Sequence, residues 1–326
     1  MSSGWPDVEG EPAFGTLAHA FRTATSRRSD RERRIALTNT LLITTKDRKV
    51  DLRKALLSAL TQAKVGEILV FDDGSTDGTS ELVRKEFPSV RLERSDRPLG
   101  IVAARNRAIE MATGSVVITI DDDCIFQSPD TVAATLKDFH GPEVGAVAIP
   151  HINVNQSAVV HSQAPRSDRV YAISEFSGGA SAIRRDLFLA LGGYNTALWR
   201  QCEEYDFCTR LLGHGYVTRC GSATPILHYE SLVRNNASII FHGARGHLLY
   251  AWCNVPLWAL IPHAVGSTAL CIVHAFRMRH LRSAAKGLVS AVSAIVSRRA
   301  RRIPVTSRVY RDIRSLRRSG PIQLGA

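Results

Sequence analysis

Three consecutive acids, Asp121, Asp122 and Asp123, follow the apolar run VVITI at residues 116–120. Like charges at the end of a buried strand repel one another and are costly to fold unless a cation neutralises them. Such oxygen ligands suit Mg²⁺ or Mn²⁺, whose remaining coordination positions a diphosphate can fill. Side chains alternate along an extended segment, so Asp121 and Asp123 should share one side and Asp122 the other. We therefore predict a divalent-metal site here, with a solvated acidic turn as the alternative.

A second acidic segment, DDGSTDGT at residues 72–79, follows the apolar run EILVF. Its carboxylates can accept hydrogen bonds from a base N–H or from ribose hydroxyls, and Gly74 allows a close backbone approach. The chain has neither a GxxxxGK[ST] nor a GxGxxG pattern, which weakens kinase-like and dehydrogenase-like interpretations. The segment is a candidate nucleotide pocket; the alternative is a turn whose Asp and Ser cap the next helix.

A third acidic cluster opens a predicted helix over residues 203–212. Glu203 and Glu204 lie at its N-terminus, where the helix dipole favours anions, so they either stabilise the helix or take part in chemistry. His228 follows 24 residues after Glu204. It is either a structural histidine or, as a neutral imidazole, a ligand for an Mn²⁺-like ion.

The segments that must position these residues alternate between strand and helix patterns. Strands are predicted at 41–43, 67–71, 90–92 and 116–120, with further ones at 144–149 and 151–154, and helices at 50–63, 79–87, 101–112, 184–191 and 203–212. The alternation predicts an α/β fold with a doubly wound, mainly parallel sheet. The first two acidic segments then lie at the carboxyl ends of strands, where open α/β sheets bind ligands.

Four motifs in register resemble the family 2 glycosyltransferases, which have the GT-A fold, and in particular the bacterial rhamnosyltransferase or polysaccharide type. The motifs are Thr44-Thr45, the 72–79 loop, Ala104-Arg105-Asn106 and the aspartate triplet. Any one of them is weak, whereas four in order and spacing are specific. The resemblance covers about residues 37–232, and it implies a GT-A-like fold for that part of the chain.

The resemblance also implies how the donor and the metal are held. Asp73, with Asp72 beside it, would contact the donor's nucleoside, and Arg105 lies in a helix that borders the donor pocket in this family. Pairing with the acidic loops is the alternative role of Arg105. The donor-binding candidates are Thr45, Asp72, Asp73, Ser75, Arg105 and Asp122. The metal candidates are Asp121 and Asp123, which form a DxD-type site, and His228, which completes it.

The 203–204 pair resembles the family's ED/DD motif, whose second acid is the general base. That acid is Glu204 here, although the family more often has Asp, and Glu203 is the alternative. The segment SGGAS at 177–181 resembles the acceptor-side turn, which makes Gly179 an acceptor-side candidate. Trp199, just before the helix, either stacks on a sugar or fills the core.

The C-terminal part differs from the rest in charge. From Arg277 onward the chain has 13 Lys/Arg and one acid, whereas residues 1–276 carry 29 residues of each sign. Residues 248–276 contain no charged side chain and are long enough to cross a bilayer. However, Pro256 and Pro262 are expected to break this stretch, and arginines after a crossing would place the preceding region outside the cytoplasm. We therefore expect a re-entrant hairpin or interfacial helices resting on anionic lipid; a helical subdomain packed on the core is the alternative.

Composition places the chain among folded proteins. With 326 residues, 44% hydrophobic and 22% charged, it is neither disordered nor a many-span membrane protein. Six cysteines without a CxxC pair, and no secretory pattern at the N-terminus, favour a cytoplasmic protein, peripheral on the inner face of the cell membrane. No nucleic-acid partner is expected, because the basic stretch has one tyrosine and no recognised module. The expected parts are an N-terminal extension (1–34), a GT-A domain (35–235), a helical membrane-associated region (236–300) and a basic tail (301–326).

These features together predict an inverting hexosyltransferase that uses Mn²⁺ or Mg²⁺. Its donor would be a nucleoside-diphosphate sugar, with uridine- or thymidine-linked sugars favoured. Its acceptor would be a hydroxyl of a glycan or lipid-linked precursor, and an anionic membrane surface would be a further partner. The alternatives are a nucleotidyl- or phosphotransferase that uses the same metal site, and a non-catalytic module that binds nucleotide sugars.

Overall fold

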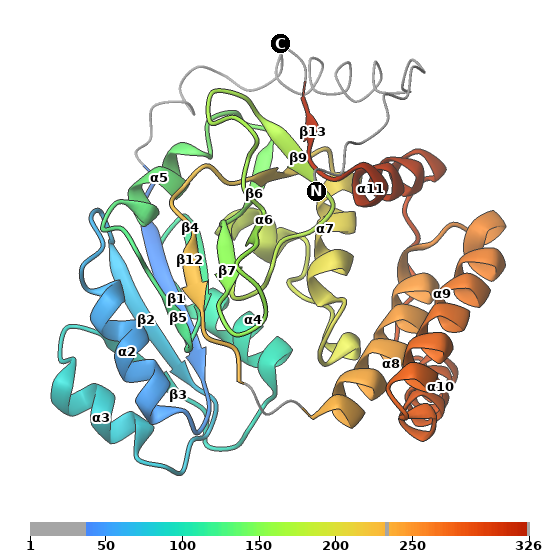
Figure 1. Cartoon of the computed structure of the whole chain (residues 1–326), viewed down its shortest axis with the longest axis horizontal. Helices are drawn as coiled ribbons and strands as arrows, with labels where there is room; N and C mark the ends of the chain where they lie inside the picture. Colours follow the sequence, from blue (N-terminus) through green and yellow to red (C-terminus); the bar gives the residue numbers. More distant parts are fainter. Residues whose placement is uncertain (1–36, 232–234, 325–326) are drawn as a thin grey trace.

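The computed structural model describes residues 37–231 and 235–324 (Figure 1). The expected N-terminal extension, residues 1–34, lies outside the described residues. The strands are β1 (Asn39–Thr45), β2 (Glu67–Asp72), β3 (Arg91–Arg94), β4 (Val116–Asp121), β5 (Cys124–Ile125), β6 (Val144–Ala148), β7 (His151–Asn153), β8 (Val160–His161), β9 (Tyr171–Ile173), β10 (Ala180–Arg184), β11 (Val217–Cys220), β12 (Ile226–His228) and β13 (Ile322–Gln323). The helices are α2 (Lys49–Ala59), α3 (Thr79–Glu86), α4 (Ile101–Met111), α5 (Thr131–Lys137), α6 (Arg185–Ala190), α7 (Glu203–Gly213), α8 (Asn236–Asn254), α9 (Leu257–Arg277), α10 (Leu281–Val296) and α11 (Ser307–Ser319), with a 3₁₀ turn η2 (Thr196–Leu198).

The central sheet has nine strands in the order β13-β9-β11-β6-β10-β4-β1-β2-β3. Its half β4-β1-β2-β3 is parallel, which confirms the predicted α/β fold and its four strands. Strand β10, which the sequence did not reveal, runs antiparallel between β4 and β6. A smaller sheet, β5-β12-β7-β8, stands beside it.

Both faces of the parallel half are covered, because every residue of β1 is buried and successive side chains point to opposite faces. Leu41 and Ile43 pack with Leu52 and Leu56 of α2. The intervening Leu42 packs in a second cluster, with apolar residues of α4, α6 and α7. This doubly wound arrangement brings the carboxyl ends of β1, β2 and β4 to one edge of the sheet.

The C-terminal part is mostly helical and packs on the part of the chain that contains the two sheets. Helix α8 packs against α9 and α10, and α11 packs on α7, while β13 adds to the sheet at β9. The residues expected as a basic tail therefore contain a helix and a sheet strand. The chain turns between α8 and α9 at Pro256, as expected, but Pro262 lies inside α9 and does not end it. A proline near the start of a helix removes one backbone hydrogen bond, and the rest of this 21-residue helix continues.

Candidate active site

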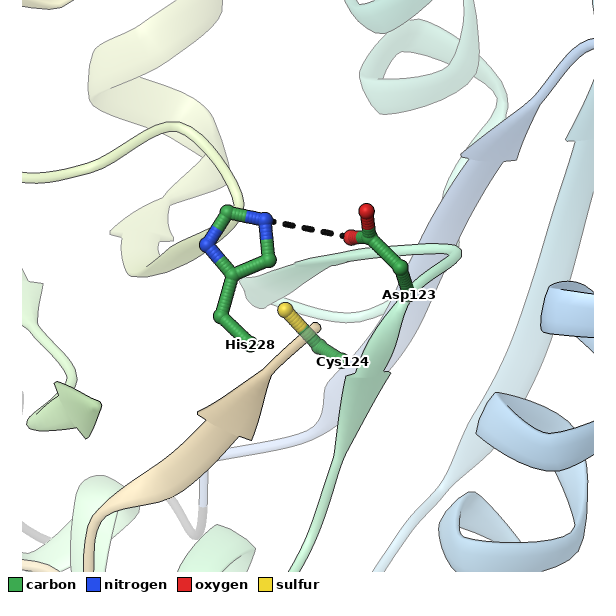
Figure 2. A group of neighbouring side chains, drawn as sticks. All are labelled: Asp123, Cys124 and His228. Carbon is green, nitrogen blue, oxygen red and sulfur yellow. Dashed lines mark ion pairs between the residues drawn. The ribbon is translucent and has the colours of Figure 1, made fainter. Parts of the chain in front are cut away.

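Two strand registers bring the predicted metal ligands together. Asp121 ends β4, and the short β5 that follows pairs antiparallel with β12, which sets His228 opposite Cys124. His228 Nε2 lies 3.1 Å from Asp123 Oδ1 (Figure 2). It also lies 3.9 Å from Asp121 Oδ2. Asp122 turns the other way and accepts a 2.7 Å hydrogen bond from Thr45 Oγ1. The predicted alternation of the three aspartates is confirmed.

The donor set at this point fits a cation. His228 Nδ1 lies 3.1 Å from Asn153 Oδ1, an acceptor, so the ring's proton belongs on Nδ1 and the Nε2 lone pair faces Asp123. Asp123 Oδ1 is buried, and among the described groups the Nε2 of His228 is its polar neighbour, at 3.1 Å. Two facing lone pairs 3.1 Å apart require a proton or a metal ion between them. That spacing is also about the distance between adjacent ligands of an octahedral ion with bonds of roughly 2.1 Å.

The pKa of His228 depends on opposing effects of burial and of the neighbouring aspartates. Burial lowers it, but the hydrogen bond and charge of Asp123 and the charge of Asp121 raise it more, so the net shift is upward. Without another cation, a proton is thus favoured on this imidazole. A divalent ion would displace that proton, because a metal-ligating imidazole must be neutral.

Arg48 is a site residue that the sequence analysis missed. It precedes α2, and its guanidinium reaches Asp123 Oδ2 at 3.0 Å and Asp122 Oδ1 at 3.3 Å. Burial is the main reason why the pKa of Asp122 is raised to about 7, and Arg48 acts in the opposite direction. Its position just past the end of β1, at the edge that also carries the aspartates, was the signal available in the sequence.

Cys124 also lies within reach of the metal candidates, as Figure 2 shows. Burial, followed by the charges of Asp121 and Asp123, raises the pKa of its thiol well above the usual value. Its Sγ lies 3.5 Å from the carbonyl oxygen of Gly179, to which the thiol donates. The neutral thiol is therefore a weak ligand, and the oxygen and imidazole groups dominate this site.

Arg105 joins the metal candidates to the predicted base. One guanidinium nitrogen lies 2.6 Å from Asp121 Oδ1 and another lies 3.6 Å from Glu204 Oε1. The arginine is 5% exposed, so its charge is little screened by water. Arg105 thus pairs with acidic groups, which is the alternative role considered for it above. It lies between Asp121 and Glu204 and contacts both.

The two glutamates that open α7 have different surroundings. Glu204 faces Arg105 and accepts a 3.2 Å hydrogen bond from the backbone N–H of Gly178. Burial raises its pKa, and Arg105 opposes that shift. Glu203 is 3% exposed, and its Oε2 has no hydrogen-bond partner among the described residues. Burial and the nearby Glu204 raise its pKa to about 8. The geometry therefore favours Glu204 over Glu203 for contact with a substrate.

Gly178 and Gly179 have no side chain, and this leaves room for the side chains of Glu204 and Asp121. A Cβ on Gly179 would lie 2.1 Å from Asp121 Oδ2, and one on Gly178 would lie 2.2 Å from Arg105 and 2.4 Å from Glu204 Oε1. Gly179, expected on the acceptor side, thus sits directly against a predicted metal ligand.

The 72–79 loop is held largely by its own contacts. Asp72 is fully buried and accepts hydrogen bonds from Ser75 N, Ser80 Oγ and Arg94. Its oxygens thus hold the loop together, and its contact with a nucleoside stays a prediction. Ser75 Oγ likewise accepts from the backbone N–H of Asp47 at 2.8 Å.

Asp73 occupies the other side of this loop. Its Oδ1 accepts from Leu99 N at 2.7 Å and Ser95 Oγ at 3.1 Å, and its Oδ2 accepts from Gly100 N at 3.0 Å. A carboxylate has about four acceptor positions, so one remains on Oδ2. Trp199 lies next to this loop, since a Cβ on Gly100 would be 3.2 Å from its indole ring. Trp199 is 54% exposed, so it does not fill the core.

Comparison with known proteins identifies the domain. The family model for glycosyl transferase family 2 matches residues 40–192. This region, just under half of the chain, is similar to family 2 glycosyltransferases. The succinoglycan biosynthesis protein ExoU of Rhizobium meliloti is 26% identical over 60% of this chain and 62% of its own length. An N-acetylglucosaminyl-diphospho-decaprenol L-rhamnosyltransferase of Mycobacterium tuberculosis is 27% identical over 63% of this chain and 83% of its own. The chain spans about three fifths of the length of ExoU and of a related Haemophilus influenzae glycosyltransferase.

Solved structures show the same fold. A mannosyltransferase of Pyrobaculum calidifontis in complex with GDP-mannose and Mn²⁺ has a TM-score of 0.55 and 22% identity, over 86% of this chain and 84% of that one. GalNAc-T7 with UDP, GalNAc and Mn²⁺ has a TM-score of 0.57 and 16% identity, over 78% and 58% of the two chains. The family 2 domain therefore has the GT-A-like fold that the motifs implied.

Proposed function

We propose that this protein transfers a hexose from a nucleoside-diphosphate sugar to an acceptor hydroxyl, with inversion at the anomeric carbon. One observation carries the proposal: His228 Nε2 faces carboxylate oxygens of both Asp123 and Asp121, and Arg105 joins Asp121 to Glu204. Mn²⁺ bound with GDP-mannose in one protein of the same fold, and with UDP and GalNAc in another, supports it.

Asp121, Asp123 and His228 would hold Mn²⁺ or Mg²⁺. Such an ion, when held by these residues, would supply positive charge against the negative charge that develops on the leaving diphosphate. Asp73 would accept the base N–H that uracil and thymine share, which is why uridine- and thymidine-linked donors are favoured. Thr45 fixes Asp122 at the floor of this site, where Arg48 adds a positive charge.

Glu204 would act as the general base. It accepts the proton from the acceptor hydroxyl while that oxygen attacks the sugar from the face opposite the diphosphate. Arg105 and the backbone N–H of Gly178 keep its carboxylate in place. A single displacement of this kind inverts the anomeric centre.

The proposal is tested by a thermal-shift panel of nucleotide sugars, each with and without Mn²⁺. A rise in Tm with UDP- or dTDP-sugars that needs Mn²⁺ is the expected result, because a ligand that binds the folded state stabilises it, and the gain increases with the logarithm of the ratio of ligand concentration to Kd. Stabilisation by nucleoside triphosphates with acceptor-independent release of pyrophosphate would overturn it in favour of a nucleotidyltransferase.

Asn153 is expected to be a positioning residue for His228. Replacing it by alanine removes the acceptor that keeps the imidazole proton on Nδ1, so Asn153→Ala should weaken Mn²⁺ binding by about 10- to 100-fold, as for other residues that orient metal ligands. Isothermal titration with Mn²⁺ measures the effect. Asn155→Ala is the control, because Asn155 lies in the same hairpin but its side-chain amide donates to the backbone carbonyl of Glu230. This substitution should leave the Mn²⁺ affinity unchanged. Equal affinity of Asn153→Ala and wild type would contradict this role.

We also propose that the protein lies on the inner face of the cell membrane. Among the described helices, α9 is the one that is long and apolar enough to cross a bilayer, and 11% of its most apolar stretch is buried. One stripe along α9 presents exposed apolar side chains: Leu257, Ile261, Val265, Ile272 and Phe276. The arginine-rich segment from Arg277 onward adds attraction to anionic lipid, at about 1 kcal/mol per charge near the surface.

Replacing two residues of this stripe tests the membrane proposal. Ile261→Glu with Val265→Glu should weaken binding to anionic vesicles at least about tenfold, because each lost apolar side chain removes roughly 1.5–3 kcal/mol of burial. The matched control, Val50→Glu with Leu57→Glu, changes two exposed apolar residues of α2. Co-sedimentation with vesicles measures both, and equal loss in the two pairs would contradict a membrane role for α9.

A further inference from the structure

A cavity of about 810 Å³ lies between α7, α8, α9 and α11, outside the metal site. Its volume is within the range of small-molecule sites, roughly 300–1,000 Å³. Figure 1 shows α11 next to α7 and close to one end of the α8–α10 helices. One wall of the cavity is basic and the opposite walls are apolar.

The basic wall is one face of α11. Arg314, Arg317 and Arg318 line the cavity, and their spacing of three and four residues places them on the same side of the helix. In the part of the chain that the structure describes, no carboxylate lies within 4.0 Å of these guanidinium groups. The three arginines therefore form no ion pair with a described carboxylate. Glu175 lies farther off, where its charge opposes the effect of burial and raises the pKa of Arg317. An anion with several oxygens suits three arginines.

Aromatic and histidine side chains hold two of these arginines in position. The guanidinium of Arg317 lies 4.5 Å from the centre of the Tyr205 ring. Arg314 lies 5.8 Å from that of Tyr310 and 3.4 Å from His263 Nδ1. Burial, and then Arg314, lower the pKa of His263 to about 4, so this imidazole is neutral and adds no charge at pH 7. Pre-positioned arginines lose less conformational entropy when an anion binds.

The other walls come from α8 and α9 and consist mostly of apolar and small residues, with His247, Ser267 and His274 among them. Ile240, Ala244, Leu270 and Cys271 contribute to them, and a Cβ built on Gly266 would meet no atom within 4 Å. Leu270 is 73% exposed and belongs to the same helix as the exposed apolar stripe. A hydrocarbon chain in the cavity could therefore continue along α9 toward the proposed membrane surface.

The cavity also adjoins the proposed base. Tyr205 lines the cavity and is the residue after Glu204 in α7. The first turn of α7 therefore lies between the cavity and the proposed metal site. Arg317 and Glu204 are both near enough to the buried Glu175 for their charges to affect its pKa, after the larger effect of burial. A molecule held by the arginines would therefore lie against the helix that carries Glu204.

We infer that this cavity binds the acceptor as a lipid phosphate, with its phosphate or diphosphate on Arg314, Arg317 and Arg318 and its hydrocarbon chain along α8 and α9. The inference rests on the proposed function, since the acceptor's hydroxyl would be the group that Glu204 deprotonates. The chemistry that it requires is an anionic phosphate joined to an apolar chain.

The test measures binding of farnesyl diphosphate to the full chain by isothermal titration, in EDTA so that the metal site cannot hold the diphosphate. Arg317→Gln with Arg318→Gln should raise the Kd at least about tenfold, because charge-assisted contacts contribute roughly 1.5–3 kcal/mol each. The matched control, Arg299→Gln with Arg301→Gln, removes the same charge at exposed arginines outside the cavity and should change the Kd less than twofold. Inorganic pyrophosphate and farnesol should each bind at least tenfold more weakly than farnesyl diphosphate.

A second variant tests whether the hydrocarbon chain lies along the α8 and α9 walls of the cavity. Gly266→Phe places a ring in the open space and should raise the Kd for farnesyl diphosphate at least about tenfold, whereas Gly266→Ala should have little effect. No binding by wild type, equal weakening by both arginine pairs, unchanged binding by Gly266→Phe, or pyrophosphate binding as tight as farnesyl diphosphate would each overturn the inference. The Mn²⁺-dependent Tm shift with donor is measured on the same variants, so a failure of this site is distinguished from a failure of the proposed function.

Discussion

Glu204→Gln is expected to lower kcat by about 10²- to 10⁴-fold, the usual contribution of a general base. Glutamine keeps the shape and can still accept from the Gly178 N–H, but it cannot take a proton from the acceptor. Donor binding should remain, so the Mn²⁺-dependent Tm shift with nucleotide sugar is expected to stay near that of wild type. Initial-rate kinetics with saturating donor measures the effect.

Glu203→Gln is the matched control for this substitution. Glu203 is buried with a pKa raised to about 8, so it is protonated at pH 7 and glutamine resembles that form. Its kcat should stay within about fivefold of wild type. A large loss for Glu203→Gln with little loss for Glu204→Gln would contradict the assignment and make Glu203 the base.

The pH dependence of the reaction rate should also identify Glu204 as the general base. A general base works only when deprotonated, and burial raises the pKa of Glu204 above the ordinary 4.5. The rate should therefore rise with pH along an acidic limb that lies above pH 4.5, and this limb should disappear in Glu204→Gln.

Gly179→Ala is expected to lower kcat by at least about 10²-fold and to weaken Mn²⁺ binding. The new Cβ would lie 2.1 Å from Asp121 Oδ2, so the carboxylate must move, and misplacing a reacting group by about 1 Å can cost that much. Gly213→Ala is the control, because a Cβ there meets only Val305 at 3.7 Å, an ordinary contact. A Gly179→Ala protein with wild-type kcat and Mn²⁺ affinity would show that Asp121 does not need this space.

The parallel half of the fold was predictable because its patterns are strong and local. Apolar runs identified β1, β2, β3 and β4, and the rule for carboxyl ends put both acidic loops at one edge. Alternation gave the correct directions of the three aspartates. Strand β10 and the small sheet were harder to predict, because short strands with glycine-rich neighbours carry little periodicity and depend on tertiary pairing.

The site was predicted less completely than the fold. His228 was expected from family resemblance, and the structure shows that the pairing of β12 with β5 positions it, a long-range contact with no local signal. Asp72 was expected to bind the nucleotide sugar; the sequence did not reveal that its buried carboxylate accepts three hydrogen bonds that hold the loop together. Arg48 was missed because a single arginine after a strand has many possible partners. Helix α11 was not predicted within the basic tail, because its few apolar residues are separated by arginines.

Mn²⁺ binding to Asp121→Asn and Asp123→Asn tests the central proposal most directly. Titration of the wild-type chain with Mn²⁺ in the presence of UDP, followed by electron paramagnetic resonance, should show one bound ion per chain. Each asparagine variant should bind it at least about tenfold more weakly, since a carboxylate ligand is lost while the shape is kept. Wild-type affinity in both variants, or no bound Mn²⁺ in the wild-type chain, would contradict a metal site at these aspartates.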